Sequence, residues 1–308
     1  MRIHRGLPAS ADRPVALTIG NFDGIHRGHQ AMLLRLIEAA DDLRLPPAVM
    51  TFEPHPREFF APQSAPPRLT SLRAKLEFFR AFGIASVFVA RFDRGLASLP
   101  PPAFIDDVLV ARLGVRWVLV GDDFRFGKAR AGDIATLRAH ARSFSVEAMN
   151  TVEADGQRVS STAVRDALDA GDMERVTALL GRPYAIAGRV GHGEKLGRRM
   201  GFPTANIALK HRPALSGIFA VKVHGLPGGS RTGVASLGVR PTVAAGGRPL
   251  LEVFVFDFDQ PIYGRRVTVE FLHKLRDEAR YPDLDTLRVK IGEDVARARD
   301  WFLAAKAA

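Results

Sequence analysis

The sequence predicts an α/β domain with a parallel sheet, followed by a small antiparallel β-barrel that ends in a helix. Between Pro14 and Asp123, short apolar runs alternate with longer amphipathic stretches, as in β-α units whose sheet is buried on both faces. Beyond residue 182, glycine and proline separate runs of alternating polarity, as in antiparallel strands. A chain of 308 residues also suits two domains, although one large barrel is a second possibility.

The elements of the first half follow from these runs. Short β-branched runs predict strands, and the stretches between them, with apolar residues at helical spacing, predict helices. The expected strands are 15–20, 48–52, 85–92 and 117–121, and the expected helices are 30–43, 72–82 and 102–113. A helix is predicted over 160–168, because the stretch begins with hydroxyl residues that can cap a helix. A further helix is predicted over 172–180 and ends at Gly-Arg-Pro. We therefore expect domains at 1–182 and 183–308.

The second half is predicted to hold five antiparallel strands and a terminal helix. The strands are expected within 184–193, 217–225, 231–239, 251–258 and 265–272. Within 284–305, apolar residues recur at helical spacing, at Leu287, Ile291, Val295 and Ala298. Such a helix has one apolar face, which we expect to pack on the barrel.

Composition and charge narrow the classes of function. Apolar residues at 46% and charged residues at 25% are typical of a folded globular protein. Subtracting 33 acidic from 44 basic residues gives +11, which favours anionic partners such as nucleotides, nucleic acid or acidic lipid. The basic residues are mostly arginines scattered singly, without the basic run of a nucleic-acid arm. No nucleic-acid partner is therefore expected, while some arginines could line phosphate sites.

The chain contains no cysteine, which excludes a disulfide framework, a thiolate zinc site and a cysteine nucleophile. The first twenty residues lack the apolar stretch of a signal peptide, and no later run approaches the ~18 residues of a membrane span. We expect a cytoplasmic protein with no membrane partner.

The strongest functional signal is the string GNFDGIHRGH at 20–29, where the first predicted strand meets the first helix. Ligands of α/β sheets bind at such junctions, and the backbone amides of a helix start favour anions. The imidazoles of His26 and His29 could donate to phosphate oxygens as negative charge develops. The string therefore indicates attack on an α-phosphate. Two histidines near Asp23 could instead form a metal site or a helix cap.

Three further strings accompany this motif in the first half. The loops TFEPHP at 51–56 and GDDFRFG at 121–127 each follow a predicted strand. Their aromatic and prolyl faces could sandwich a flat ring system, although aromatics that cap a core beside a turn would look the same. In the string RVSSTAVR at 158–165, Ser-Ser-Thr before a helix would by itself usually be an N-cap. The string also resembles the Ser/Thr-rich loop that binds the nucleotide in nucleotidyltransferases, which implies a nucleotide contact.

The second half carries its own polar constellation. In GEKLGRRMGFPTAN at 193–206, glycines and basic residues lead to Thr204 and Asn206, whose oxygens suit Mg²⁺. A glycine-rich barrel turn is the alternative. Glu252 alternates with buried positions and shares a face with Phe254 and Phe256, so it could take a proton from a hydroxyl that attacks a γ-phosphate. An exposed glutamate at the barrel edge is the alternative there.

Taken together, the chain resembles the bifunctional riboflavin kinase/FAD synthetase family of bacteria, and 26–29 resembles its nucleotidyltransferase signature H-x-G-H. The resemblance is carried by GNFDGIHRGH, TFEPHP, VGDDFRFG, RVSSTAVR, LLGRPY, GFPTAN, SLGVRPT, EVFVFDF, IYG and LRDE. It implies a Rossmann-like nucleotidyltransferase domain that joins FMN to AMP from ATP, giving FAD and pyrophosphate. It also implies a β-barrel kinase that uses ATP and Mg²⁺ to convert riboflavin to FMN, releasing ADP.

The same resemblance assigns site residues. It implies an ATP site for adenylyl transfer, with His26 and His29 catalytic, at Gly20, Asn21, His26, His29, Ser160, Ser161, Thr162 and Arg165. It implies a flavin site near Pro54, Asp123 and Phe126. In the kinase it implies ATP contacts at Gly201, Thr204 and Asn206, Mg²⁺ ligands at Thr204 and Asn206, a base at Glu252, and flavin contacts at Arg276 and Glu278. Asp123 stands where a relative can carry Asn, and a carboxylate only accepts hydrogen bonds where an amide also donates.

Three alternative functions compete with this interpretation. A basic nucleic-acid-binding protein would need a basic stripe with interleaved aromatics, which the sequence lacks. A flavin-responsive regulator would need one domain without its catalytic residues, whereas each half carries its set. An adenylyltransferase with another acceptor would leave the second half unexplained.

Overall fold

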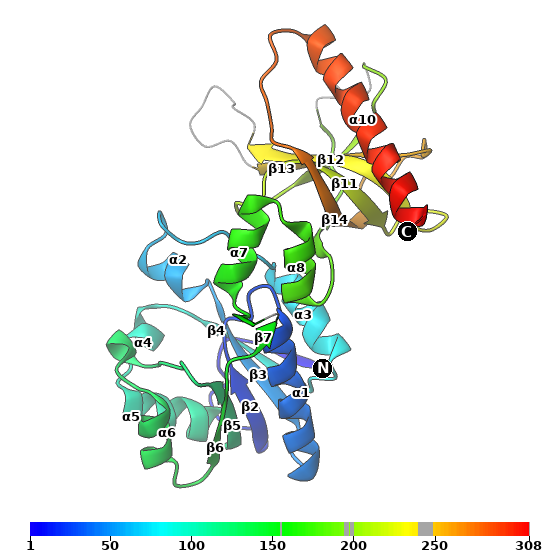
Figure 1. Cartoon of the computed structure of the whole chain (residues 1–308). Coiled ribbons are helices and arrows are strands. Elements are labelled where there is room, and N and C mark those ends of the chain that lie inside the picture. Colours follow the sequence, from blue (N-terminus) through cyan, green and yellow to red (C-terminus); the bar gives the residue numbers. More distant parts are fainter. Residues whose placement is uncertain (155, 194–196, 198–199, 240–248, 308) are drawn as a thin grey trace. The chain divides into compact units, whose positions relative to one another are not determined.

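The computed structural model describes residues 1–154, 156–193, 197, 200–239 and 249–307 (Figure 1). These residues form two compact units. The first contains Met1–Pro66 and Thr70–Ser161, and the second contains Pro67–Leu69 and Thr162–Ala308.

The first unit is built on a six-stranded sheet in which every neighbouring pair is parallel, in the order β1-β4-β3-β2-β5-β6. The strands are β1 (Arg2–Arg5), β2 (Val15–Ile19), β3 (Pro47–Glu53), β4 (Ser86–Arg91), β5 (Val115–Gly121) and β6 (Ser145–Met149). This confirms the predicted parallel sheet and adds β1 and β6 at its edges. From β2 the chain builds toward β3 and β4 on one side and later toward β5 and β6 on the other. Ligands of open α/β sheets bind at such a reversal, beyond the carboxyl end of the central strand.

Helices connect and cover these strands. They are α1 (Arg27–Asp42), α2 (Pro56–Phe60), α3 (Leu72–Ala81), α4 (Arg94–Ala97), α5 (Pro101–Ala103), the π-helix η1 (Phe104–Arg112), the 3-10 turn η2 (Lys128–Arg130) and α6 (Ile134–His140). Two short strands, β7 (Glu153–Ala154) and β8 (Gln157–Arg158), form a hairpin before the Ser-Ser-Thr loop. The predicted helices at 30–43, 72–82 and 102–113 correspond to α1, α3 and the α5–η1 stretch.

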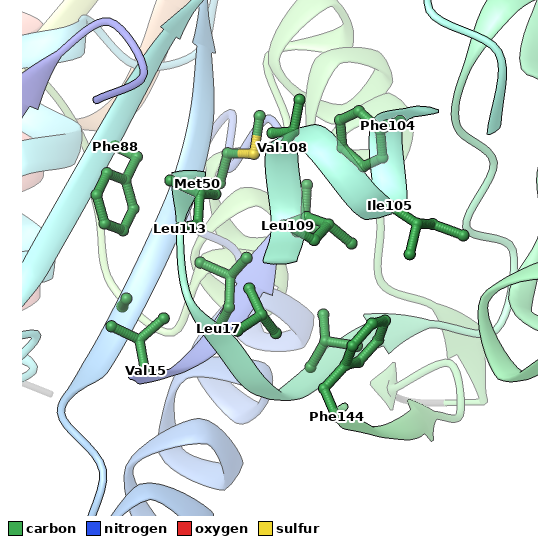
Figure 2. Packing of buried hydrophobic residues seen from close by; sticks show 14 of the residues in the cluster. Val15, Leu17, Met50, Phe88, Phe104, Ile105, Val108, Leu109, Leu113 and Phe144 are labelled. Atoms are coloured by element: carbon green, nitrogen blue, oxygen red, sulfur yellow. The ribbon is translucent and has the colours of Figure 1, made fainter. Parts of the chain in front are cut away.

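The sheet is buried on both faces, as its unbroken apolar runs predict. Val15, Leu17 and Ile19 of β2 pack with η1 and α6 in one core cluster (Figure 2). Ala16, between them in sequence, packs with α1 and α3 in a second cluster on the other face. Because the period of a strand is two residues, neighbouring positions of one short strand serve two cores. The strand is thus fixed from two sides, and so is the start of the turn that follows it.

The second unit is a curved six-stranded antiparallel sheet in the order β10-β13-β12-β11-β14-β9. Its strands are β9 (Tyr184–Arg189), β10 (Thr204–Ala208), β11 (Gly217–His224), β12 (Arg231–Val239), β13 (Pro249–Val255) and β14 (Arg266–Arg276). Gly191, two residues after β9, forms an isolated antiparallel bridge with Asn206 of β10, so the sheet closes partly into a barrel. Five strands agree with the prediction, and β10 had been interpreted as part of a loop.

In the described part of the chain, the helices α7 (Ser161–Ala170), α8 (Met173–Leu180) and α10 (Leu284–Ala307) accompany this sheet. The terminal helix α10 packs across β11, β12 and β14 (Figure 1). The helices α7 and α8 precede β9, and α8 contacts β9 and β14. Helix α8 ends at Gly181 with φ 70°, a left-handed conformation that glycine adopts without strain. The predicted boundary at residue 182 follows α8 directly and stays a prediction.

Candidate functional sites

The turn after β2 has an unusual backbone. Phe22 has φ 50°, Gly24 has φ 91° and Ile25 has φ 45°, so three of four consecutive residues are left-handed. For a residue other than glycine this conformation costs about 1–3 kcal/mol and persists only where the surroundings enforce it. The side chains of Phe22 and Ile25 are fully buried in the second core cluster. Burial of these two side chains therefore anchors the strained turn from below.

Polar contacts hold the same turn from its sides. The backbone N–H of Thr70 donates to Asp23 Oδ1 at 2.9 Å, and the N–H of Gly24 donates to Thr70 Oγ1 at 2.9 Å. Ser161 Oγ donates to the carbonyl of Asp23 at 2.8 Å. This last bond joins the Ser-Ser-Thr loop to the turn, although 138 positions separate the two residues. Two of the strings that sequence analysis singled out thus meet in space.

His26 and His29 lie one helical turn apart with their rings stacked, 3.7 Å between centroids and 19° between planes. His26 is the N-cap of α1, and its Nδ1 accepts a hydrogen bond from the backbone N–H of His29 at 3.3 Å. The helix-cap interpretation is therefore correct for His26, and neutral His26 carries its proton on Nε2. Among the residues that the structure describes, no group of three or more metal-ligating side chains supports the metal alternative.

His29 is held uncharged at neutral pH. Burial lowers its pKa well below the usual value, and the nearby charges of His26 and Lys75 lower the pKa further. Its Nδ1 is buried without a hydrogen-bond partner, as is Oδ1 of Asn21 in the same motif. Buried polar atoms are rarely left unpaired, so these two atoms are candidates for contact with a ligand.

Lys75 is a functional candidate that sequence analysis missed. Its side chain is 3% exposed on α3, and Nζ donates to the backbone carbonyl of Asn21 at 3.0 Å. A signal was present, because Lys75 falls on the apolar face of 72–81 together with Leu72 and Phe79. A charged residue on such a face is either a snorkelling side chain or one with a specific partner.

The expected flavin residues of the first unit have mixed surroundings. Pro54 is exposed at the end of β3, after a cis peptide bond with Glu53. Asp123 forms an ion pair with Arg158 at 2.5 Å, so the carboxylate has a cationic partner. Phe126 is 6% exposed and packs against Phe104 and Phe124 in the first core cluster. The interpretation as a core-capping aromatic therefore describes Phe126 as it lies here.

Four of the residues expected in the second unit, Thr204, Glu252, Arg276 and Glu278, line one cavity of about 200 Å³, whereas Gly201 and Asn206 are not part of its lining. Its polar lining includes Thr204, Ser236, Glu252, Arg276 and Glu278. Its apolar lining comes from the loop before β10, from β11, β12 and β13, from the segment after β14 and from α10. It includes Phe202, Phe254, Tyr281, Leu287 and Ile291. Such a cavity, mostly apolar with a few converging polar groups, is the usual form of a small-molecule site.

Sheet register places Glu252 at the centre of this arrangement. Glu252 lies directly opposite Asn206 of β10 on one side and Ser236 of β12 on the other. Val253 and Val255 are buried, whereas Glu252 and Phe254 face the cavity, which confirms the predicted alternation. Phe254 and Phe256 are in ring contact at 5.9 Å, on the same side as Glu252.

Thr204 and Asn206 form a small oxygen-rich site beside Glu252. Asn206 Nδ2 donates to the carbonyl of Thr204 at 3.1 Å, which leaves Asn206 Oδ1 buried without a partner. A Cβ on Gly193 would lie 2.5 Å from that Oδ1, so glycine keeps this space open. Gly201, with φ 90°, occupies the turn before β10. The unpaired oxygen and the space around it fit a hard cation or a hydrogen-bond donor.

A larger cavity of about 410 Å³ lies against the same strands. Its lining includes Pro203, Val253, Asp259 and Tyr263, and it also includes Thr204. Thr204 thus belongs to the walls of two cavities in the second unit.

Arg276 is fixed by a carboxylate that sequence analysis missed. Its Nε and Nη2 donate to the two carboxylate oxygens of Asp294 on α10, at 2.8 and 2.5 Å. Asp294 is 4% exposed, and its hydrogen bonds raise the pKa of Arg276. Asp294 falls among the apolar positions of the predicted terminal helix, a signal of the same kind as for Lys75. Glu278, the second residue expected here, accepts from Ser236 Oγ at 3.3 Å.

Asp294→Asn is expected to destabilise the second unit by about 1.5–3 kcal/mol, because the half-buried guanidinium of Arg276 loses hydrogen bonds to a charged partner. Thermal unfolding of the full chain measures the effect. Asp300→Asn is the matched control, since Asp300 lies exposed on the same helix. Equal unfolding temperatures for the two variants would show that the pair with Arg276 does not hold α10 to the sheet.

Comparison with known proteins gives matches over both units. A family model described as FAD synthetase matches residues 9–163, and one described as riboflavin kinase matches residues 180–302. The bifunctional riboflavin kinase/FMN adenylyltransferase of Haemophilus influenzae is 47% identical over 309 residues, covering 98% of this chain and 99% of its own. The Pseudomonas fluorescens protein of the same description is 49% identical, covering 97% of each chain.

A solved structure has the same fold over nearly the whole chain. It is a crystal structure described as a macrolide-efflux protein from Streptococcus pneumoniae, with a TM-score of 0.82 and 28% identity, covering 98% of this chain and 100% of that chain. In the described part of the present chain, no helix has the length and apolar character needed to cross a membrane.

Proposed function

The chain belongs to the family of bifunctional riboflavin kinases/FMN adenylyltransferases, and from this premise we propose which residues carry each reaction. It is a transferase of flavin biosynthesis with riboflavin kinase and FMN adenylyltransferase activities. The observation that carries the proposal is the correspondence between family models and sites. The model described as FAD synthetase covers the turn at 20–29, and the model described as riboflavin kinase covers the cavity around Glu252.

In adenylyl transfer, the phosphates of ATP bind against the turn at 20–26 and the start of α1. A phosphate oxygen of FMN attacks the α-phosphorus, and the bond to the β-phosphate breaks to release pyrophosphate. His26 and His29 donate hydrogen bonds to the oxygens on which charge develops. Gly20, Asn21, Ser160, Ser161, Thr162 and Arg165 complete the nucleotide contacts. The hydrogen bond from Ser161 to the turn supports this grouping.

The flavin of this reaction is proposed to bind near Pro54, Asp123 and Phe126. The ion pair of Asp123 with Arg158 makes the carboxylate an acceptor that is already occupied in part. Contact of Asp123 with the flavin ring therefore requires a donor group on the ring, which the acceptor sites not used by Arg158 can receive.

In phosphoryl transfer, Glu252 takes the proton from the terminal hydroxyl of riboflavin's side chain. The resulting oxygen attacks the γ-phosphorus of ATP, and the bond to the β-phosphate breaks to release ADP. The flavin ring occupies the cavity of about 200 Å³ beside Phe254 and Arg276. The nucleotide occupies the cavity of about 410 Å³, with Gly201 and Thr204 at its phosphate end. Thr204, in the wall of both cavities, lies where the two substrates would meet.

Mg²⁺ is the proposed metal of the kinase, with Thr204 and Asn206 as its ligands. The buried, unpaired Oδ1 of Asn206 supports this assignment. When bound, Mg²⁺ neutralises charge on the phosphates of the nucleotide. Asn206 Nδ2 donates to the backbone carbonyl of Thr204 at 3.1 Å and to its hydroxyl oxygen at 3.4 Å, and these bonds orient the two side chains.

Asn206→Leu is expected to raise the Mg²⁺ concentration needed for half-maximal FMN formation by roughly tenfold or more, because lost metal-site contacts typically cost that much affinity. The assay titrates Mg²⁺ at fixed ATP and riboflavin. Conversion of supplied FMN to FAD by the same variant is the internal control and is expected to keep its Mg²⁺ dependence. An unchanged Mg²⁺ dependence of FMN formation would exclude Asn206 as a ligand.

Domain limits and surroundings complete the proposal. The adenylyltransferase is assigned to 1–182 and the kinase to 183–308, a boundary close to the interval between the family models. The molecules bound are riboflavin, FMN, FAD, ATP, ADP and pyrophosphate, without nucleic acid or membrane. Because both reactions consume ATP, the cytoplasm is the proposed location.

The direct test is a time course with purified protein, riboflavin, ATP and Mg²⁺, in which riboflavin, FMN and FAD are separated by chromatography. FMN is expected to appear before FAD, since the product of the kinase is the substrate of the adenylyltransferase. FMN without FAD would mean that the first unit uses another acceptor. Conversion of neither flavin would favour the regulator or nucleic-acid alternatives.

A further inference from the structure

Lys75 lies beneath the turn at 20–26 and belongs to none of the strings assigned to the nucleotide site. Its stem runs along the face of α3 that packs into the second core cluster, and its side chain is 3% exposed. An ammonium group is costly to bury unless hydrogen bonds and charges compensate. The hydrogen bond from Nζ to the carbonyl of Asn21, at 3.0 Å, is therefore a specific interaction at the base of the turn.

That carbonyl controls the direction of the next peptide group. It also accepts from Thr51 Oγ1 at 3.3 Å, so two donors fix the plane of the peptide between Asn21 and Phe22. In a trans peptide the C=O and N–H bonds point in opposite directions. With the carbonyl held against Lys75, the N–H of Phe22 points to the side away from the lysine. The peptide held in this orientation is followed directly by Phe22, whose φ of 50° is left-handed.

The positive charge of Lys75 also acts on His29 in the candidate nucleotide site. His29, in the first turn of α1, and Asn21, in the turn at 20–26, each carry a buried polar atom without a hydrogen-bond partner. The titratable groups that act on His29 are His26, at the start of α1, and Lys75 from α3, and each lowers the pKa of His29. A fixed cation in a low-dielectric setting attracts the phosphates of a nucleotide more strongly than one in water.

We propose that Lys75 is a positioning residue for adenylyl transfer, which orients the turn at 21–25 through Asn21 and places a buried positive charge beneath the nucleotide's phosphates. This rests on the proposed role of the turn as the nucleotide site. It adds a residue on a different helix, 46 positions after His29, that acts through Asn21 and His29.

Two substitutions separate the effect of the positive charge of Lys75 from the effect of its hydrogen bond to Asn21. Lys75→Met removes the charge and the hydrogen bond while keeping the length of the stem, and Lys75→Gln removes the charge but keeps a donor. Arg73→Met on the exposed side of the same helix is the matched control. For each full-length variant, KM for ATP and kcat are measured in the conversion of supplied FMN to FAD across pH. FMN formation from riboflavin reports folding of the rest of the chain.

Lys75→Met is expected to lower kcat/KM for ATP by roughly 10- to 100-fold, the range for losing a hydrogen bond to a charged group. The acid side of its pH profile is expected to move to higher pH. Removal of a neighbouring positive charge makes protonation of His29 easier, which raises its pKa. Lys75→Gln is expected to recover part of kcat/KM and to keep the displaced pH profile. FMN formation and the Arg73→Met variant are expected to match the parent protein within about twofold, as for surface substitutions.

A Lys75→Met protein with the parent's KM for ATP and pH profile would overturn the proposal. If Lys75→Met fails to fold, Lys75→Gln decides alone, and an undisplaced pH profile there would overturn it. His29→Ala distinguishes this failure from failure of the proposed site. If His29→Ala still forms FAD, the nucleotide site is misplaced, and if it is inactive while Lys75→Met is normal, only the role of Lys75 is wrong.

Discussion

His29→Ala is expected to abolish FAD formation while leaving FMN formation near that of the parent protein. The imidazole would donate to oxygens that gain charge at the α-phosphate, and removal of one such donor typically costs about 10² to 10³ in kcat. The stacked contact with His26 is lost as well. The loss is therefore expected at the upper end of that range. The assay supplies FMN and ATP, follows FAD, and measures FMN formation from riboflavin in parallel.

His140→Ala is the matched control for this substitution, because His140 is an exposed histidine of α6 in the same unit. It is expected to leave FAD formation unchanged. Equal loss of FMN and FAD formation in His29→Ala would contradict two separate sites. Normal FAD formation in that variant would exclude His29 from adenylyl transfer.

Glu252→Gln is expected to stop FMN formation and to leave conversion of supplied FMN to FAD intact. Glutamine preserves the size of the side chain but cannot accept the proton of the attacking hydroxyl, and general-base assistance is worth about 10² to 10⁴ in rate. Because Asn206 and Ser236 flank Glu252 through backbone pairing, the strand register does not depend on the carboxylate. The variant is therefore expected to unfold at a temperature close to that of the parent protein.

Glu270→Gln serves as the control in the barrel, since Glu270 lies on β14 and pairs with His224 at 2.9 Å. FMN formation by Glu270→Gln is expected to be normal. If Glu252→Gln retained FMN formation, another base would have to serve the kinase. Loss of both activities in Glu252→Gln would indicate misfolding or one shared site.

Most of the fold could be predicted because buried strands and amphipathic helices have simple periodicities. Three strands, β1, β6 and β10, were not predicted from the sequence, and the cause differs between the edge strands and β10. β1 has the sequence RIHR and β6 contains Glu147, so each edge strand lacks an apolar run. β10 has the sequence TANIA, in which Thr204 and Asn206 interrupt the apolar pattern. Edge strands and site-bearing strands are those in which burial constrains the side chains least.

Candidate site residues could be proposed from the sequence where they are contiguous, as at 20–29 and 201–206, and their roles stay predictions. Lys75 and Asp294 escaped because their partners are remote, at Asn21 and Arg276. The ion pair between Asp123 and Arg158 escaped for the same reason. Only the fold brings such pairs together. A charged residue among the apolar positions of a predicted helix was the available signal for Lys75 and Asp294, and it gave no indication of the partner.

The pairing of Asn206, Glu252 and Ser236 across three strands makes this part of the chain intolerant of length changes. One residue inserted into β13 ahead of Glu252 would turn the carboxylate to the opposite face of the sheet. Two inserted residues would restore the face but displace the carboxylate along the strand by roughly 7 Å, beyond reach of the same neighbours. Insertions and deletions that preserve kinase activity are therefore expected to fall outside β10, β12 and β13.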